Sequence, residues 1–361
     1  LPDRIRINER NSCVDWTLYR DATGFDALKD EWNDLLARTR FNTIFLTWEW
    51  QSTWWQHLGQ NRGPLYILAA RDAGRLVAIL PLYVGDDAGP VLQVVGCIEV
   101  SDYLDLIIEE GREEEVYRYF LAWLSGPDAP AWNSVDLCNQ PAASLSHALL
   151  PKLAEEAGFV TEVFQEDVSP VIGLPRPDDG TEPAIEAAWD AYLGSLDKKE
   201  RHEIRRKIRR MDREAPEAAI RFADGAAGLD ADVERFVALH RHSRSDKHAF
   251  MSDEMQAYFR AIAHILADRG WLQLSFLEIG GEAVASYFCF DYGNDILVYN
   301  SGYDPAGVPQ LSPGWVLLAQ LIEHAIRLGR RRFDFLQGDE DYKHRFGGID
   351  TPVYRTILRR N

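Results

Sequence analysis

The chain has 361 residues, and 46% of them are hydrophobic, which is enough for about two domains with buried cores of their own. The formal charge is 39 − 57 = −18. This excess of acids argues against a general nucleic-acid-binding protein and against a protein that lies on anionic lipid. No apolar run reaches the roughly 18 residues of a membrane helix, so we expect a cytoplasmic protein without membrane insertion. The four cysteines, which we expect to be reduced thiols, are far apart and form no CxxC pair: Cys13, Cys97, Cys138 and Cys289.

Hydrophobic periodicity and turn residues predict the elements of the first half. The predicted strands are 15–19, 65–71, 75–84, 91–97, 104–108, 133–138 and 159–164, and the predicted helices are 25–36, 47–58, 112–124 and 142–157. Helix 47–58 carries four tryptophans, at positions 48, 50, 54 and 55. Their spacing fits a helix packed on a sheet, so we favour a core role over stacking on a sugar or a base. A stretch rich in Pro and Gly, 170–183, then indicates a linker.

The second half opens with a helix at 184–195 and a strongly basic helix at 198–213. Ile204, Ile208 and Met211 form a narrow apolar stripe on the basic helix. Its other face either meets a phosphate-bearing acceptor or is a solvated surface offset by nearby acids, and we favour the solvated surface. The remaining predicted helices are 229–243, 252–268 and 312–328, and the predicted strands are 218–222, 271–279, 282–291, 295–300, 333–335 and 351–358.

Two segments of the chain repeat in the same order. Gly63–Ala78 matches Gly270–Ala285 at a constant offset of 270 − 63 = 207, and Phe45–Gln51 matches Phe250–Gln256 at 250 − 45 = 205. Two amphipathic hairpins can resemble each other by chance, but chance is a poor explanation for several matches that occur in the same order along the chain. We therefore predict an α/β (α+β) fold with two similar domains, 1–175 and 184–361. Each is expected to pair a mixed, mostly antiparallel sheet with flanking helices.

The segment 311–348 holds most of the polar groups that suggest chemistry. Ser312 is placed to cap a helix, Pro313 suits its first turn, and Gly314 lets a ligand approach the backbone. The short strand 333–335 then leads into a loop rich in Asp, Glu, Tyr and Lys. A helix start beside such a loop is suited to holding an anion and moving a proton.

Several motifs together resemble a known family. They are Lys198-Lys199-Glu-Arg, Val284-Ala285, Tyr299-Asn-Ser-Gly-Tyr-Asp304, Leu311-Ser-Pro-Gly314, Phe333-Asp-Phe335, Gly338-Asp-Glu340, Tyr342-Lys343 and, in the first half, Ser101-Asp-Tyr-Leu-Asp105. With these motifs and this order of elements, the chain resembles the Gcn5-related N-acetyltransferase (GNAT) superfamily. It is most similar to the acetyltransferases of cellulose-biosynthesis operons, which are relatives of the Fem peptidyltransferases. The resemblance implies tandem GNAT-like domains, with an active site in the second domain and none of its own in the first.

The resemblance also implies a co-substrate, acetyl-CoA or another acyl-CoA. Its expected binding residues, at the start of helix 312–328, are Gln310, Leu311, Ser312, Gly314 and Trp315. GNAT enzymes usually have Gln/Arg-x-x-Gly-x-Gly/Ala in this place, whereas this chain has Gln310-Leu-Ser-Pro-Gly-Trp-Val316. Because Pro313 has no N–H, this loop offers fewer donors to a pyrophosphate than the usual one.

Four residues of the C-terminal loop are candidates for catalysis. Lys343 is suited to neutralise a phosphate or polarise a carbonyl, or else it is a surface lysine paired with a nearby acid. Tyr342 is suited to protonate a departing thiolate, or else it packs on the sheet. Asp339 and Glu340 are candidates for a general base, although loop acids are more commonly solvated.

Candidate substrate-binding residues follow the central strands of both halves. They are Tyr299, Asn300, Tyr303 and Asp304 in the second half, and Asp102, Tyr103 and Asp105 in the first. In a GNAT-like fold this is where the sheet splays to admit a ligand, and the first-half residues would shape the acceptor cleft. Ordinary turn chemistry is the alternative for both groups.

Residues and resemblance together predict an N-acyltransferase that moves an acyl group from acyl-CoA to a small-molecule amine acceptor, such as a sugar or a cell-envelope precursor. No DNA partner is expected, and the net charge speaks against RNA. Two rival functions remain: a Fem-type transferase that takes an amino acid from charged tRNA, and a non-catalytic binding protein in a polysaccharide assembly system. No metal is expected, because the histidines at 240, 242, 248 and 264 show no ligand arrangement.

Overall fold

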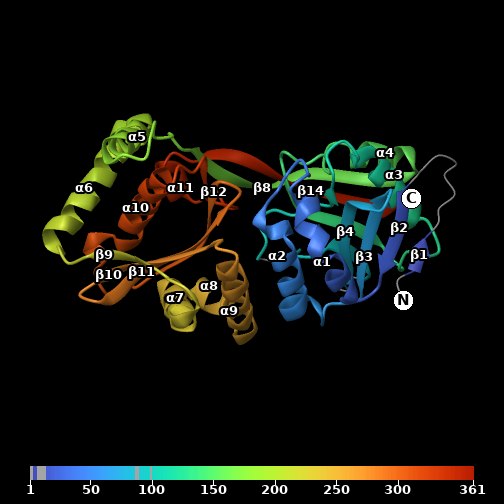
Figure 1. Ribbon diagram of the computed structural model, residues 1–361, viewed down its shortest axis with the longest axis horizontal. Coiled ribbons are helices and arrows are strands. Elements are labelled where there is room, and N and C mark those ends of the chain that lie inside the picture. Colours follow the sequence, from blue (N-terminus) through green and yellow to red (C-terminus); the bar gives the residue numbers. More distant parts are fainter. Residues whose placement is uncertain (1–2, 6–13, 86–88, 98–99) are drawn as a thin grey trace. The chain divides into compact units, whose positions relative to one another are not determined.

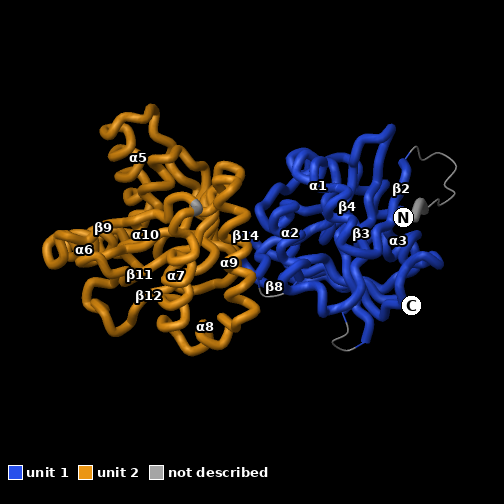
Figure 2. The backbone as a smooth tube through the Cα atoms, turned by 60° about the horizontal axis from the view of Figure 1, so that its bottom comes forward, with its two compact units in different colours: residues 1–168, 351–361 blue, residues 169–350 orange. Residues whose placement is uncertain are grey.

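The computed structural model describes residues 3–5, 14–85, 89–97 and 100–361. The chain forms two compact units: unit 1 contains Leu1–Val168 and Thr351–Asn361, and unit 2 contains Ser169–Asp350 (Figure 2). The sequence assigned the last residues to the second domain, whereas Thr351–Asn361 belong to unit 1. Among the residues described, no helix combines the length and the apolar character needed to cross a membrane.

Unit 1 is built on one sheet with the strand order β1-β2-β3-β4-β5-β7-β14, and β6 pairs with β4. Neighbouring strands are antiparallel except β5 and β7, which are parallel. The strands are β1 (Asp3–Ile5), β2 (Val14–Tyr19), β3 (Leu65–Asp72), β4 (Arg75–Gly85), β5 (Val91–Val94), β6 (Ile107–Ile108) and β7 (Ser134–Pro141). The helices are α1 (Thr23–Leu36), α2 (Trp48–Trp54) with a continuation over Trp55–Gly59, α3 (Glu113–Leu124) and α4 (Leu150–Glu156).

Helices cover both faces of the unit 1 sheet (Figure 1). Gly24 of α1 lies against Ile67, and the ring of Trp123 in α3 is 6.5 Å from that of Tyr66. Since successive side chains of a strand point to opposite faces, α1 and α3 lie on opposite sides. Trp50, Trp54 and Trp55 are buried, which confirms the predicted core role for these three, whereas Trp48 is half-buried.

Unit 2 has the strand order β13-β12-β11-β10-β9, and only β12 and β13 are parallel. Its strands are β9 (Ala219–Phe222), β10 (Leu272–Ile279), β11 (Glu282–Tyr292), β12 (Asp295–Tyr303) and β13 (Arg332–Asp334). Its helices are α5 (Glu182–Ser195), α6 (Lys198–Glu214), α7 (Leu229–Ser243), α8 (Ser245–Phe250), α9 (Asp253–Asp268), α10 (Pro313–Arg327) and α11 (Asp341–Arg345). One buried cluster joins α5, α6 and α10 to one face of the sheet. On the other face, Phe236 of α7 and Phe259 of α9 pack against Phe288.

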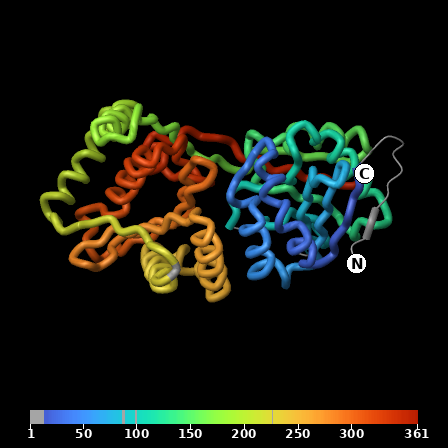
Figure 3. The backbone as a smooth tube through the Cα atoms, viewed as in Figure 1, coloured from blue at the N-terminus to red at the C-terminus, as the bar shows by residue number. Residues whose placement is uncertain are grey.

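Two long strands complete the sheets, and the chain can be followed through them in Figure 3. β8 (Phe159–Gly173) begins in unit 1 and ends in unit 2, where Ile172 pairs with Phe333 of β13. β14 (Ile349–Arg360) runs the other way and ends in unit 1, where Leu358 pairs with Val135 of β7. Each unit therefore takes one strand from the opposite half of the sequence.

Equivalent backbone details confirm the predicted duplication. The β3–β4 hairpin shifts register between Ala70 and Arg71, and the β10–β11 hairpin shifts between Leu277 and Glu278. These positions differ by 277 − 70 = 207, which is the offset of the sequence repeat. The side chain of Thr47 caps α2 by accepting from Trp50 N, and that of Ser252 caps α9 by accepting from Met255 N. The fold is therefore two similar units of mixed, mostly antiparallel sheets with flanking helices.

Local chemistry explains where the elements differ from the prediction. The predicted helix 142–157 is helical only over α4, because the Ser144 hydroxyl accepts from the Ser146 N–H and stabilises a turn instead. The helices α8 and α11 were not predicted, since both are too short to show a period.

Cys97 and Cys138 are joined by a disulfide, so the prediction of reduced thiols is wrong for this pair. Cys13 lies outside the described residues.

Candidate functional site

Strands β12 and β13 part in the middle of the unit 2 sheet. Their parallel pairing covers only Asp295–Leu297 and Arg332–Asp334, and β12 then continues to Tyr303. On its other side, β12 pairs Val298 with Cys289 and Asn300 with Phe288, so Tyr299 is an extra residue in the ladder. Such a bulge bends a strand and re-aims its side chains, and bulges are frequent beside active sites.

Helices α7 and α8 bring two ionisable side chains to the parted strand. His240 of α7 places Nε2 3.1 Å from Asn300 Oδ1. Lys247 of α8 donates from Nζ to the Ser301 carbonyl O at 2.5 Å. The helix approaches the strand closely because Gly302 has no side chain: a Cβ there would lie 2.3 Å from His240 N. Asn300, Ser301, His240 and Lys247 therefore form one polar cluster at the parting of the strands.

Burial sets the charge states in this cluster. The pKa of Lys247 is lowered to about 8, mainly by burial and secondly by the positive charge of Arg244, while Asp246 and Glu340 act in the opposite direction. Burial likewise lowers the pKa of His240 to about 4, so this histidine is neutral near pH 7. A lysine with a pKa near neutrality is suited to exchange a proton with an amine. The sequence predicted a role in catalysis or substrate binding for neither residue, because only the packing of α7 and α8 on β12 brings them there.

The four substrate-binding residues predicted on and after β12 divide into two pairs. Tyr299 packs its ring 5.1 Å from that of Phe290, and Asn300 belongs to the polar cluster. Tyr303 is exposed, and Asp304 accepts from the Ala306 N–H at 2.9 Å. The first pair therefore lies at the parting of the strands, and the second pair lies in the turn that follows.

Lys343 lies in α11 and holds the loop that follows β13. Its side chain is buried, and its Nζ donates to the carbonyl O atoms of Leu336, Gln337 and Gly338 at 3.2, 2.5 and 3.0 Å. Glu340 Oε2 lies 2.9 Å from the same nitrogen. Because an ammonium has three N–H groups, these partners occupy all of them. Lys343 thus stabilises the loop between β13 and α11.

Replacing Lys343 by Met should lower the free energy of unfolding by about 3 kcal/mol, because it leaves buried carbonyl oxygens without their charged donor. Chemical denaturation measures this change. Lys199→Met is a suitable control, since its side chain is 86% exposed, and it should leave the denaturation midpoint nearly unchanged. Equal midpoints for the two variants would contradict the role of Lys343 in holding the loop.

The other predicted catalytic residues lie around Lys343. Tyr342 packs its ring 6.0 Å from that of Phe335, and burial raises its pKa well above the usual value, so the hydroxyl stays protonated at neutral pH. Asp339 and Glu340 are exposed. Throughout the part of the chain that the structure describes, no group of three His, Cys, Asp or Glu residues is arranged to hold a metal ion.

A second polar cluster surrounds the start of α10. Ser312 adopts a left-handed conformation with φ of 53°, and its hydroxyl accepts from Lys207 Nζ at 2.7 Å. The N–H groups of Trp315 and Val316 both donate to the Ser312 carbonyl O. Pro313 has no N–H. Among residues 313–316, all of which the structure describes, Gly314 is therefore the residue whose N–H makes no hydrogen bond in the structure. Of the remaining predicted residues, Gln310 is exposed and Leu311 is buried.

Two cations flank the indole ring at this helix start. Lys207 Nζ lies 5.1 Å from the centroid of the Trp315 ring, and the Arg345 guanidinium lies 4.5 Å from it. The same ring packs 4.6 Å from that of Phe346, so Trp315 is anchored in the core of unit 2. Side-chain cations from α6 and α11, in place of a row of amides, therefore make this helix start attractive to an anion.

In unit 1, the positions that correspond to the two polar clusters of unit 2 carry different side chains. Its own Gln51 donates to the carbonyl O atoms of Phe45 and Val95 at 2.8 and 3.1 Å, at the end of β5. Helix α3 starts with three glutamates, Glu113, Glu114 and Glu115, which disfavour a phosphate at that helix start. Of the predicted residues in unit 1, Tyr103 is buried against Phe41. Asp102 and Asp105 are half-buried.

Comparisons with known proteins identify relatives of the fold. Residues 198–344 match the family model described as Acetyltransferase (GNAT) domain, and no curated protein matches the sequence. The chain is similar to the crystal structure of FemX, with a TM-score of 0.61 and 10% identity over 94% of this chain and 96% of that one. It is also similar to a conserved protein of unknown function from Bacteroides thetaiotaomicron VPI-5482, with a TM-score of 0.56 and 12% identity over 92% of this chain and 97% of that one.

At such identities the likeness to solved structures is one of fold. The family match covers β12 with its bulge, the helices that bring His240 and Lys247, and the start of α10. Residues 198–344, which lie in unit 2, therefore match an acetyltransferase (GNAT) domain, and the chain has an overall fold like that of FemX.

Proposed function

We propose that the protein is an N-acyltransferase that moves an acyl group from acyl-CoA to an amine and that its reaction centre is the parting of β12 and β13 in unit 2. The observation that carries this proposal is the cluster of Lys247, His240 and Asn300 beside the bulge at Tyr299. Direct transfer between two bound substrates requires positioning and a proton acceptor, and it requires no covalent nucleophile on the protein.

The donor would bind with its phosphates at the start of α10. Lys207, Arg345 and the hydroxyl of Ser312 supply charge and hydrogen bonds there, and they compensate for the amides that this loop lacks. Burial lowers the pKa of Lys207, although the nearby Glu203 opposes the shift. A phosphate beside this ammonium would favour its charged form.

In the proposed reaction the amine nitrogen attacks the thioester carbonyl carbon and forms a tetrahedral oxyanion. Lys247, in its neutral form, accepts the proton that the nitrogen releases. Collapse of the intermediate breaks the C–S bond and leaves a CoA thiolate. Tyr342, whose hydroxyl stays protonated because burial raises its pKa, is the candidate that gives the thiolate its proton. The acceptor would approach from the side of α7 and α8, where Lys247 lies.

One feature favours a second candidate function, transfer of an amino acid from charged tRNA. Helix α6 carries nine Lys and Arg against four Asp and Glu, a net 9 − 4 = +5, on a chain of net charge −18. A basic surface of this kind suits a nucleic-acid backbone. Several of these charges are already paired, as Arg206 is with Glu203 and Arg210 with Glu214, so we favour acyl-CoA. A non-catalytic binding protein remains the third candidate.

The test is an assay of purified protein with acetyl-CoA and longer acyl-CoAs against a panel of amines, with free CoA thiol and acylated product measured together. Product and thiol in equal amounts would support the proposal. Aminoacyl transfer that falls steeply with salt would instead support the tRNA-dependent rival. Absence of turnover with either donor, together with tight binding of a polysaccharide precursor, would favour the non-catalytic rival.

Lys207→Gln should raise the KM for acyl-CoA about tenfold and leave kcat unchanged, because a charged hydrogen bond to phosphate is worth about 1.5–3 kcal/mol. Steady-state kinetics measures this effect. The matched control is the corresponding acyl-pantetheine, which has no phosphate: with this donor the variant and the natural protein should have the same KM. A rise in KM with both donors would place Lys207 elsewhere in the reaction.

A further inference from the structure

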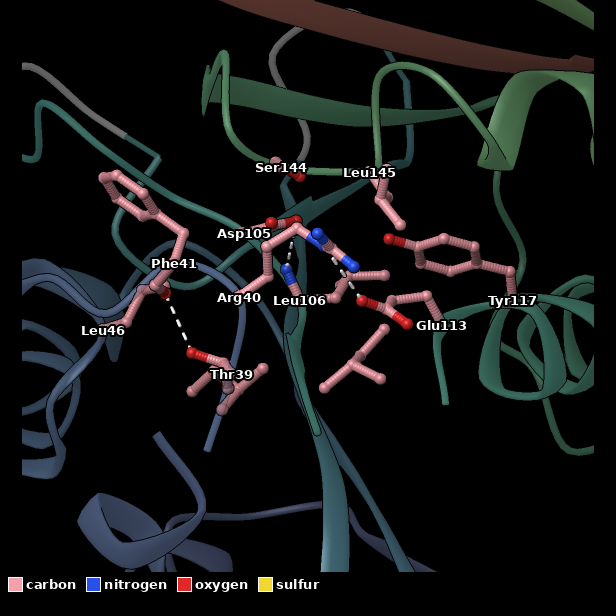
Figure 4. Close-up of a pocket in the computed structure, with 12 residues that line it drawn as sticks. Thr39, Arg40, Phe41, Leu46, Asp105, Leu106, Glu113, Tyr117, Ser144 and Leu145 are labelled. Carbon is pink, nitrogen blue, oxygen red and sulfur yellow. Dashed lines mark hydrogen bonds and ion pairs between the residues drawn. The ribbon is translucent and has the colours of Figure 1, made fainter. Parts of the chain in front are cut away.

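Unit 1 contains a small pocket that the proposed reaction does not use (Figure 4). Its walls come from the segment after α1, from the strand β6 with the residues before it, from the first turn of α3, and from the loop before α4. Its lining includes the polar side chains of Arg40, Asp105, Glu113, Tyr117 and Ser144. All of these residues belong to unit 1.

The charges in this pocket do not balance. Arg40 is shared between two acids, with Nε 3.3 Å from Glu113 Oε1 and an Nη 3.2 Å from Glu110. Glu113 is buried and accepts in addition from the Gly111 N–H at 2.7 Å. The hydrogen bonds that the structure shows for Asp105 come from neutral donors, the Leu106 N–H at 2.8 Å and the hydroxyls of Ser146 and Ser144. The pocket therefore holds two carboxylates and one guanidinium, and the uncompensated negative charge lies at Asp105.

Hydrogen bonds hold the Asp105 carboxylate in place. The Ser146 hydroxyl has one hydrogen, which it donates to Asp105 Oδ1, so the Tyr117 hydroxyl must donate to Ser146 Oγ, 2.9 Å away. Tyr117 is itself buried on α3. The acid thus has a fixed orientation through a chain of two hydroxyls, and it is not free to turn toward solvent.

We infer that this pocket binds a small primary ammonium compound, whose charged nitrogen donates to the Asp105 carboxylate. The pocket has room for a water-sized group, which suits an ammonium, whereas a quaternary head group has no N–H to donate to the carboxylate. Apolar side chains around it, among them Phe41, Leu46 and Leu145, would contact the methylene groups of the ligand. Burial and the nearby Glu113 raise the pKa of Asp105 to about 6. A bound cation would stabilise the ionised carboxylate and lower this pKa again. Since every group lies in unit 1, the inference does not depend on the proposed reaction.

The test is calorimetry on the full chain, without any acyl donor, using propylammonium as the probe. Neutral propanol of similar shape and tetramethylammonium are the matched control ligands. Propylammonium should bind with a dissociation constant of about 1 mM, as expected for one charged contact, and both controls should fail to bind. Asp105→Asn should weaken binding at least about tenfold, whereas Glu114→Gln should have no effect, because Glu114 lies on the same helix turn but outside the pocket.

A second measurement keeps the inference testable if the Asp105 variant does not fold. In the natural protein, propylammonium should slow hydrogen exchange of the amides in segments 39–46 and 105–113. Equal binding of propylammonium and propanol would overturn the inference, and so would binding without protection of these segments. Absence of any binding at millimolar concentrations would identify the pocket as a purely structural cavity.

Discussion

Lys247→Met is expected to reduce acyl transfer by about 1,000-fold, which is the typical contribution of a positioned general base. Met has a similar length and no proton to exchange, so the variant tests the amine and not the packing. In the natural protein the rate should rise as the pH is raised through about 8, because the pKa of Lys247 is lowered to that value and only the neutral amine accepts a proton. The same rise should be absent from the variant.

The acceptor amine also loses a proton as the pH rises, and this changes the rate of both proteins equally. The natural protein and Lys247→Met are therefore compared with the same acceptor, so that the difference between their pH profiles reports on Lys247 alone. Lys152→Met, at an exposed position of unit 1, is the control and should keep the full rate and the natural pH profile.

The stability of Lys247→Met provides a further check. A lysine whose pKa is lowered in the folded state opposes folding while it is protonated, so stability rises with pH between about 8 and the unfolded value. The variant should therefore be no less stable than the natural protein below pH 8. A rate within about threefold of the natural protein would exclude Lys247 as the proton acceptor.

Gly302→Ala should be among the most destabilising single substitutions in unit 2. The added Cβ would lie 2.3 Å from His240 N and 2.5 Å from Leu239 C, so backbone atoms of α7 would have to move. Overpacking of this kind costs about 3 kcal/mol, and thermal denaturation should show the melting temperature of unit 2 falling. The displaced helix carries His240, so transfer should fall with it.

Gly194→Ala is the matched control for Gly302→Ala. Gly194 lies in α5, and nothing is within 4 Å of a Cβ added there. Since alanine reduces the entropy of the unfolded chain, this variant should be slightly more stable than the natural protein. If Gly302→Ala were as stable as Gly194→Ala, α7 would not pack on β12 as closely as the structure shows.

Features encoded in short stretches of sequence were predictable. The duplication could be read because each hairpin repeats at an offset of 207, and the structure repeats the register shift at the same offset. The helix start at Pro313 also follows from local chemistry. The predicted cap at Ser312 is wrong, because this residue is left-handed and its side chain makes no capping hydrogen bond. Tyr299 and Asn300 were predicted from their place at the end of a central strand, and the structure puts both within β12.

The candidate site was less predictable, because its side chains come from distant elements. The sequence singled out Lys343 as an isolated charge in a polar loop, and the structure shows its ammonium bound to three carbonyl oxygens. Lys247 attracted no notice, because its short helix has no period and its lowered pKa depends on burial under neighbours that are distant in sequence. Lys207 appeared to be one of many charges on a solvated helix until its contact with Ser312 was known.

By itself, the sequence determined the order of most elements and the internal repeat, since both depend on local patterns of residues. Only the tertiary structure decided which strand completes each sheet and which amine lies at the parting of β12 and β13. The physical reason is that strand exchange, close helix packing and pKa shifts arise from contacts between residues far apart along the chain. No local period encodes such contacts.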